Sequence, residues 1–173
     1  MERPNAWLTY SDADMQDLET VAKKYRHFLN VGKTERECIT QIVKEAEEAG
    51  YVSLEEKVKN GEDLKAGDKV YQVGMQKIIA LYHIGEEDLA QGMNILCAHI
   101  DSPRLDIKQN PLYEDTDLAY LDTHYYGGVK KYQWVALPMA MHGVIVKKDG
   151  TVVNVTFGED EDDPVLYITD LLI

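Results

Sequence analysis

The sequence predicts a mixed α/β fold that is helical at first and built of strands later. In the first third, apolar residues recur every three or four positions, which is the period of a helix with one buried face. From Tyr51 the pattern changes to short apolar runs bounded by turn residues. One such run, Asn94–Ala98, is nearly continuous and ends in a polar cluster, as expected of a strand buried on both faces of a sheet.

Two helices are predicted before residue 50. Ser11 and Asp14 suit the N-cap and the third position of the first helix, and Thr34 and Glu37 form a capping box for the second. Gly50 would end the second helix. The predicted buried stripes consist of Met15, Leu18, Val21, Ala22, Tyr25, Phe28 and Leu29 in the first helix, and of Cys38, Ile39, Ile42, Val43, Ala46 and Ala49 in the second.

The middle of the chain is predicted to form strands. Lys69–Val73 and Lys77–Ile84 follow turn signals and have strand composition. Glu86–Gln91 is long enough for one helical turn before the buried run. Pro103 follows that run closely and limits its continuation.

After about Gln109 the chain is predicted to turn at Asn110-Pro111 and to enter a tyrosine-rich stretch. Met141–Lys147 and Thr151–Phe157 flank an Asp-Gly turn and predict a hairpin. Val165–Ile173 is a further predicted strand. Because it runs to the last residue without a closing turn or cap, the sequence is expected to be cut from a longer chain.

Composition and charge exclude several classes of protein. The sequence holds 18 Lys and Arg against 31 Asp and Glu, a net charge of −13, which would repel a nucleic-acid backbone. No run approaches the about 20 apolar residues that a membrane helix needs. The N-terminus has no secretory layout, and two cysteines are too few for a disulfide framework. A cytoplasmic protein without nucleic-acid or membrane partners is therefore expected.

His99 and Asp101 are the candidate site residues. His99 follows a predicted buried strand, the position where α/β sheets place ligand-binding groups. Asp101 lies two residues on, so its side chain points to the same side of an extended backbone. A carboxylate there can accept the second imidazole N–H of a metal-bound histidine. The alternative is a histidine capped for structural reasons at a strand end. His124 is a reserve candidate for substrate contact, and the clustered tyrosines, Tyr126 among them, are interpreted as core or interface.

Several segments, in order, resemble one enzyme family. Ala98–Leu105 is similar to the His-Thr-Asp-Ser-Pro signature of the dinuclear-zinc aminopeptidases typified by aspartyl aminopeptidase and vacuolar aminopeptidase I. Asp122–Gly128 resembles the family's Glu-Thr-Tyr-Gly-Gly segment. Trp134 followed by Met139–Val146, and then Val165–Ile173, resemble later family strands. The resemblance covers roughly residues 70 to 173.

The resemblance implies a zinc-exopeptidase-like three-layer domain. Residues 1–109 would be the N-terminal part of this catalytic domain, and residues 110–173 would begin an inserted β-rich dimerisation domain. His99 maps to a metal ligand and Asp101 to the catalytic-site carboxylate that orients it. Two zinc ions, with cobalt or manganese as alternatives, would bridge a hydroxide that attacks the first peptide bond. The other ligands and the general base would lie outside this sequence, so the fragment alone is expected to be inactive.

Peptides are the implied substrates, and a homo-oligomer built from dimers, up to a dodecamer, is the implied assembly. The sequence departs from aspartyl-type members after Trp134, where Val135–Pro138 replaces their Asp-Arg, and it carries Lys130-Lys131 after the glycines. These differences suggest a divergent bacterial-type branch and leave open whether acidic or apolar N-terminal residues are preferred. A metal-dependent exopeptidase of different specificity and a non-catalytic binding or assembly module are the alternatives.

Overall fold

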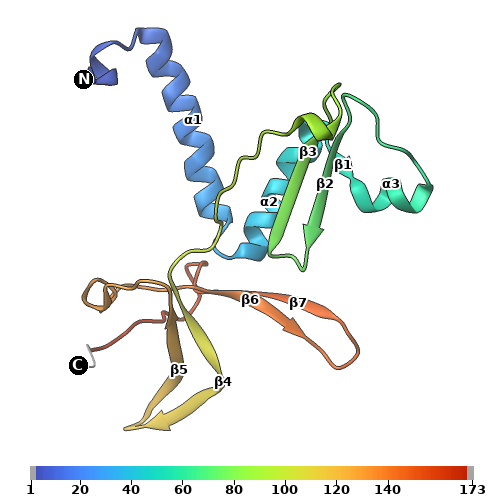
Figure 1. The fold of residues 1–173 in the computed structure, drawn as a ribbon. Helices are drawn as coiled ribbons and strands as arrows, with labels where there is room; N and C mark the ends of the chain where they lie inside the picture. Colours follow the sequence, from blue (N-terminus) through green and yellow to red (C-terminus); the bar gives the residue numbers. More distant parts are fainter. Residues whose placement is uncertain (1–2, 171–173) are drawn as a thin grey trace. The chain divides into compact units, whose positions relative to one another are not determined.

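The computed structural model describes residues 3–170 (Figure 1). The chain divides into two compact units, Met1–His99 and Ile100–Ile173. The first unit contains the helices and one mixed sheet, and the second contains two antiparallel hairpins (Figure 1).

The first unit begins with two long helices that start where the sequence predicts. A short 3-10 turn, η1 (Ala6–Leu8), precedes α1 (Asp12–Val31), and α2 (Glu35–Glu48) follows. Both α-helices open with complete capping boxes, at Ser11 and at Thr34. The Asp14 carboxylate accepts the Ser11 backbone N–H at 2.8 Å, which lowers the pKa of Asp14, and a seryl hydroxyl bond adds to the effect. The capping predictions are confirmed.

A three-stranded sheet follows α2. The two-residue strand β1 (Val52–Ser53) pairs in parallel with β2 (Lys69–Gly74), which pairs antiparallel with β3 (Ile78–His83). Met75 and Gln76 connect β2 to β3 with positive φ values of 48° and 58°, as a tight hairpin turn requires. β2 and β3 confirm the two strands predicted for this region, whereas β1 is not among the predicted elements.

One further helix was not expected from the hydrophobic pattern. The hydrophobic pattern does not predict the helix α3 (Leu54–Asn60), because seven residues are too few for a helical period to be recognised. Its local signals are nevertheless present: Ser53 accepts the Glu56 N–H at 3.4 Å, and Gly61 ends the helix with φ 69°.

The core of the first unit lies between α2 and the sheet. Among the described residues, the buried hydrophobic side chains are Cys38, Ile39 and Ala46 of α2 and Val70 of β2. Ile42 and Val43 are half-buried, and Ala49 is exposed despite the prediction. Polar contacts join the same elements: Tyr71 donates a 2.8 Å hydrogen bond to Glu47, which raises the pKa of Tyr71 to about 12. The second helix is therefore the one that anchors this sheet.

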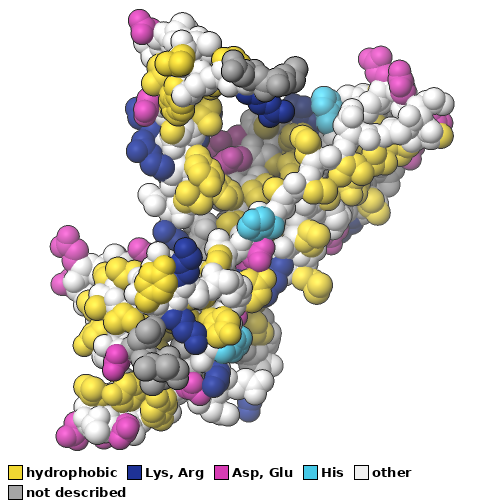
Figure 2. Space-filling model, turned by 60° about the vertical axis from the view of Figure 1, so that its left-hand side comes forward, with side chains coloured by type: hydrophobic (Ala, Val, Ile, Leu, Met, Phe, Trp, Pro, Cys, Tyr) yellow, Lys and Arg dark blue, Asp and Glu magenta, His cyan; other side chains and the backbone are white. Residues whose placement is uncertain are grey.

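The prediction of a buried stripe on α1 is wrong for this structure. None of its residues is buried, and Val21 and Tyr25 are 66% and 61% exposed. Figure 2 shows hydrophobic side chains standing on the molecular surface. An amphipathic period indicates that a helix has an apolar face, but burial also needs a complementary apolar surface against that face. The described part of the first unit does not supply one along α1.

The segment predicted as a buried strand is also different. After the 3-10 turn η2 (Leu89–Gln91), which confirms the predicted helical turn, residues 92–103 form no helix or strand. Leu96 is fully exposed and Ile95 is 70% exposed. A strand needs neighbours for its backbone hydrogen bonds, and no described residue pairs with Asn94–Ala98. Asn94–Ala98 has the apolar composition of a buried strand, but no described strand lies beside it to form a sheet.

The second unit opens with a long hairpin. Strand β4 (Arg104–Asp115) pairs antiparallel with β5 (Leu118–Tyr126) through a turn at Thr116 and Asp117. The register shifts between Ile107 and Leu112, so the predicted turn at Asn110-Pro111 is instead an irregularity within β4. Proline lacks the N–H that the ladder uses, which explains why pairing is interrupted there and then resumes.

A second hairpin follows the 3-10 turn η3 (Lys131–Gln133). Strands β6 (Met141–Val146) and β7 (Val152–Phe157) pair antiparallel, which confirms the predicted Asp-Gly hairpin. The predicted strand at Val165–Ile173 is reduced to two isolated bridges, Val135 with Ile168 and Met139 with Leu166, over the residues that are described. Residues 171–173 of that prediction lie outside the described part of the chain.

The capping box of α2 gives a testable contribution to stability. Because the Thr34 hydroxyl accepts the Glu37 N–H at 3.3 Å, Thr34→Ala is expected to lower the free energy of unfolding by about 1 kcal/mol. Urea denaturation followed by circular dichroism measures the change. Thr40→Ala, an exposed position inside the same helix, is the matched control and should cost less than about 0.5 kcal/mol. Equal losses for both variants would contradict the capping role.

Candidate functional site

The two predicted site residues lie on either side of the boundary between the units. His99 is the last residue of the first unit, and its side chain is exposed. Asp101 is the second residue of the other unit and is half-buried. Both belong to the segment without helix or strand that leads into β4. The two candidate residues therefore differ in their exposure to solvent.

Asp101 accepts a hydrogen bond from a tyrosine at the end of the second strand of the first hairpin. The Tyr126 hydroxyl donates a 2.8 Å hydrogen bond to Oδ2 of Asp101. Tyr126 is the last residue of β5 and pairs with Arg104, the first residue of β4. The antiparallel register therefore carries Tyr126 back beside the segment that contains Asp101, although 25 residues separate the two in sequence.

Arg104 fixes the tyrosine ring in turn. Its guanidinium carbon lies 4.1 Å from the centroid of the Tyr126 ring, within the range of a cation–π interaction. Its Nε donates a 2.7 Å hydrogen bond to Oδ1 of Asp106, and both side chains are partly buried. Asp106, Arg104, Tyr126 and Asp101 thus form a connected row of polar and aromatic contacts.

Gly127, the first of two glycines after β5, lies beside Pro103. Gly127 has φ +74°, a left-handed conformation that side chains disfavour, and its ideal Cβ position lies 3.5 Å from Cα of Pro103. The chain therefore leaves β5 directly beside Pro103. Two motifs that are separate in the sequence, Asp101–Pro103 and Tyr126–Gly128, meet in the structure.

The remaining histidines have other surroundings. His124 lies on β5 with its Nδ1 3.5 Å from the carbonyl oxygen of the next residue, and it is exposed. His142 has its Nε2 2.8 Å from Oε1 of Glu159, a hydrogen-bonding distance. Within residues 3–170, no three His, Cys, Asp or Glu side chains come together in a way that could hold a metal ion. A complete ligand set is not formed by the described residues.

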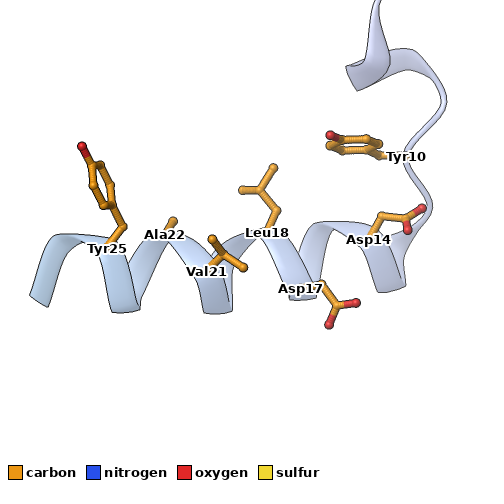
Figure 3. A pocket seen from close by; sticks show the side chains of 7 residues that line it. All are labelled: Tyr10, Asp14, Asp17, Leu18, Val21, Ala22 and Tyr25. Carbon is orange, nitrogen blue, oxygen red and sulfur yellow. The ribbon is translucent and has the colours of Figure 1, made fainter. Parts of the chain in front are cut away.

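A shallow, open hollow follows the exposed face of α1. It is bordered by Tyr10 and by apolar side chains of that helix, with Leu18, Ala22 and Tyr25 projecting from one side (Figure 3). Of its two carboxylates, Asp14 is already engaged in the helix cap. This hollow is the unburied apolar stripe of α1 and has none of the chemistry expected of a catalytic site.

Sequence reasoning does not single out Arg104, and it interprets Tyr126, together with the other clustered tyrosines, as core or interface. Two of those tyrosines, Tyr113 and Tyr120, stack their rings at 5.2 Å across the hairpin. The available signal for Tyr126 was its place immediately before Gly127-Gly128. Its partner could not be known without the register of β4 and β5.

A histidine two residues before a carboxylate is an arrangement that metal sites use, in which the carboxylate orients the imidazole. The family model of aminopeptidase I zinc metalloproteases, the M18 peptidases, matches residues 28–173. The chain therefore belongs to the M18 family of zinc aminopeptidases, and the α/β fold class and the family resemblance are confirmed.

Relatives and solved structures agree with this assignment. The chain is 55% identical over 172 residues to the probable M18 family aminopeptidase 1 of Clostridium acetobutylicum, covering 99% of this chain and 37% of the relative. It is 42% identical to that of Thermotoga maritima, covering 99% of this chain and 36% of the relative. The chain thus spans little more than a third of the curated relatives it matches.

Two crystal structures are similar over nearly the whole chain. Aminopeptidase I from Borrelia burgdorferi B31 superposes with a TM-score of 0.89 at 35% identity, covering 97% of this chain and 41% of that structure. Aminopeptidase I from Clostridium acetobutylicum superposes with a TM-score of 0.84 at 55% identity, covering 100% of this chain and 38% of that structure.

Over the described residues, no helix combines the length and apolar character that crossing a membrane demands.

Proposed function

We propose that this chain forms the N-terminal part of a zinc-dependent aminopeptidase, in which His99 is a metal ligand and Asp101 orients it. The observation that carries the proposal is the His-x-Asp-Ser-Pro segment, residues 99–103, inside the region matched by the M18 family model. Removal of N-terminal residues from peptides is the proposed reaction of the whole protein.

The donor chemistry of the two residues suits zinc. A neutral imidazole is a favoured zinc ligand, and a carboxylate that accepts its second N–H fixes the tautomer and raises the basicity of the coordinating nitrogen. His99 is exposed enough to reach an ion, and Asp101 is already held by a hydrogen bond. When bound, zinc would supply Lewis-acid polarisation of a peptide carbonyl and a water molecule of lowered pKa. Two ions, with cobalt or manganese as alternatives to zinc, are proposed for the whole protein.

The 173-residue chain by itself is proposed to be inactive. Zinc sites in catalysis use three protein ligands, and the described residues bring no such group together. The missing ligands and the general base would lie beyond Ile173, in agreement with the 37% coverage of the Clostridium relative. Residues 1–109 would belong to the catalytic domain, and residues 110–173 would begin the inserted domain.

The first experiment reads the open reading frame past the codon for Ile173 and compares the encoded full-length protein with the 173-residue chain. Zinc content is measured by atomic absorption, and release of the N-terminal residue is assayed on peptides that begin with acidic, basic or apolar residues. We expect bound zinc and hydrolysis for the full-length protein only. A stop codon directly after Ile173, or a full-length protein without zinc and without hydrolysis, would overturn the proposal in favour of a binding or assembly module.

The assembly and location of the full-length protein are also proposals. Apolar side chains of the first hairpin, Leu112, Tyr113 and Leu118, are 51–72% exposed, which supports contact between copies through the second unit. A homo-oligomer built from dimers, up to a dodecamer, and a cytoplasmic location complete the proposed function. Light scattering of the full-length protein measures the assembly.

A further inference from the structure

We propose that Tyr126 is a positioning residue of the active site, which holds the Asp101 carboxylate in the orientation that the metal-binding imidazole needs. The inference rests on the proposed function, because it assigns Asp101 the role of orienting His99. It adds the last residue of β5 to the site. It also assigns a function to the contact between the Asp101–Pro103 and Tyr126–Gly128 segments.

The hydrogen bond is suited to positioning. The Tyr126 hydroxyl donates to Oδ2 of Asp101 at 2.8 Å, close to the optimum for a hydroxyl and a carboxylate. A carboxylate has two oxygens, so a bond at Oδ2 is compatible with Oδ1 accepting an imidazole N–H. The tyrosine hydroxyl is therefore one of the groups that limit the directions in which Asp101 can present its charge.

The tyrosine is itself held from two sides. Its ring lies under the guanidinium of Arg104, which Asp106 fixes through a 2.7 Å hydrogen bond. Its backbone is fixed by the pairing of Arg104 with Tyr126, the first pair of the ladder, at the end opposite the Thr116–Asp117 turn. Because the ring is held independently of the hydroxyl, Tyr126→Phe removes the bond to Asp101 while retaining the aromatic contact. The variant is therefore a selective test.

A matched control stands one position earlier. Tyr125 is in the same strand and its ring lies 5.3 Å from the Lys131 ammonium, so it has a similar cation–π contact. Successive residues of a strand point to opposite faces, so Tyr125 is directed away from the side that carries the Tyr126 contact. Tyr125→Phe makes the same chemical change at a position without a bond to Asp101.

The test uses the full-length protein. Tyr126→Phe is expected to lower kcat about 10-fold and to weaken zinc binding, as loss of an outer-shell partner typically does. KM should change less than about twofold, because the hydroxyl is proposed to act on the carboxylate rather than on the substrate. The midpoint of thermal unfolding should stay close to that of the wild type. Tyr125→Phe should leave kcat, KM and zinc affinity unchanged.

A double-mutant cycle with Asp101→Asn identifies the route of the effect. If Tyr126 acts through Asp101, Tyr126→Phe should cause little further loss in kcat once Asp101 has been replaced. Independent, multiplicative losses would overturn the inference, as would a Tyr126→Phe variant with wild-type kcat and zinc affinity. An equal effect of Tyr125→Phe would also overturn it, because the effect would then be structural.

Failure of this inference can be separated from failure of the proposed function. If Asp101→Asn lowers activity and zinc affinity while Tyr126→Phe changes neither, only the role of Tyr126 is wrong. If Asp101→Asn has no effect on either quantity, the site assignment on which the inference depends is wrong.

Discussion

Replacing His99 by alanine is expected to reduce the aminopeptidase activity of the full-length protein by more than about a hundredfold, with loss of bound zinc. Removing an outer-shell partner of a metal ligand typically costs 10- to 100-fold, and removal of the ligand itself should cost more. His99 directly follows the apolar segment Asn94–Ala98, and its imidazole is exposed. The proposed function depends on this side chain more than on any other. Zinc content and kcat/KM measured on the same preparation test this result.

His27→Ala is the control for this variant. His27 is also exposed, lies in α1 and has no place in the motifs shared with the family. It should keep its zinc and its activity. His124→Ala tests the reserve candidate, for which a rise in KM with full zinc content would indicate substrate contact. A His99→Ala protein that retains its zinc and its turnover would remove His99 from the metal site.

Replacing Ile39 by alanine is expected to lower the free energy of unfolding by about 2–5 kcal/mol, the range for truncating a buried aliphatic side chain. Ile39 is 1% exposed and packs in the layer between α2 and the sheet. Few other side chains of the described residues are as fully buried, so neighbouring groups have little apolar material with which to fill the cavity. Urea denaturation of the 173-residue chain, followed by circular dichroism, measures the loss.

Ile145→Ala makes the same substitution at a position that is 57% exposed in β6. Its cost should stay within about 0.5 kcal/mol, as for surface positions in general. Similar losses at both positions would contradict the assignment of the large loss at Ile39 to its burial.

Local signals in the sequence were sufficient for many elements. The capping boxes at Ser11 and Thr34 set the starts of α1 and α2, since the bonds join residues only three positions apart. The Asp-Gly turn set the β6–β7 hairpin for the same reason. Family membership was also accessible, because the His-x-Asp-Ser-Pro segment and the double-glycine segment occur in the right order.

Burial was predicted less well, because it depends on surfaces that are distant in sequence. The period of α1 shows an apolar face, yet Val21 and Tyr25 remain exposed. Leu96 has the composition of a buried strand and is fully exposed, since no strand of the described chain lies beside it. Hydrophobic pattern states what a segment can bury, whereas the neighbouring elements determine what it does bury.

By itself, the sequence determined the helix starts, the second hairpin, the family and the two candidate residues, His99 and Asp101. Each of these depends on residues close together in the chain or on an ordered set of motifs. Only the tertiary structure decided that Tyr126 contacts Asp101 across 25 residues and that Arg104 holds the ring. The physical reason is the antiparallel register of β4 and β5, which pairs the first residue of one strand with the last residue of the other.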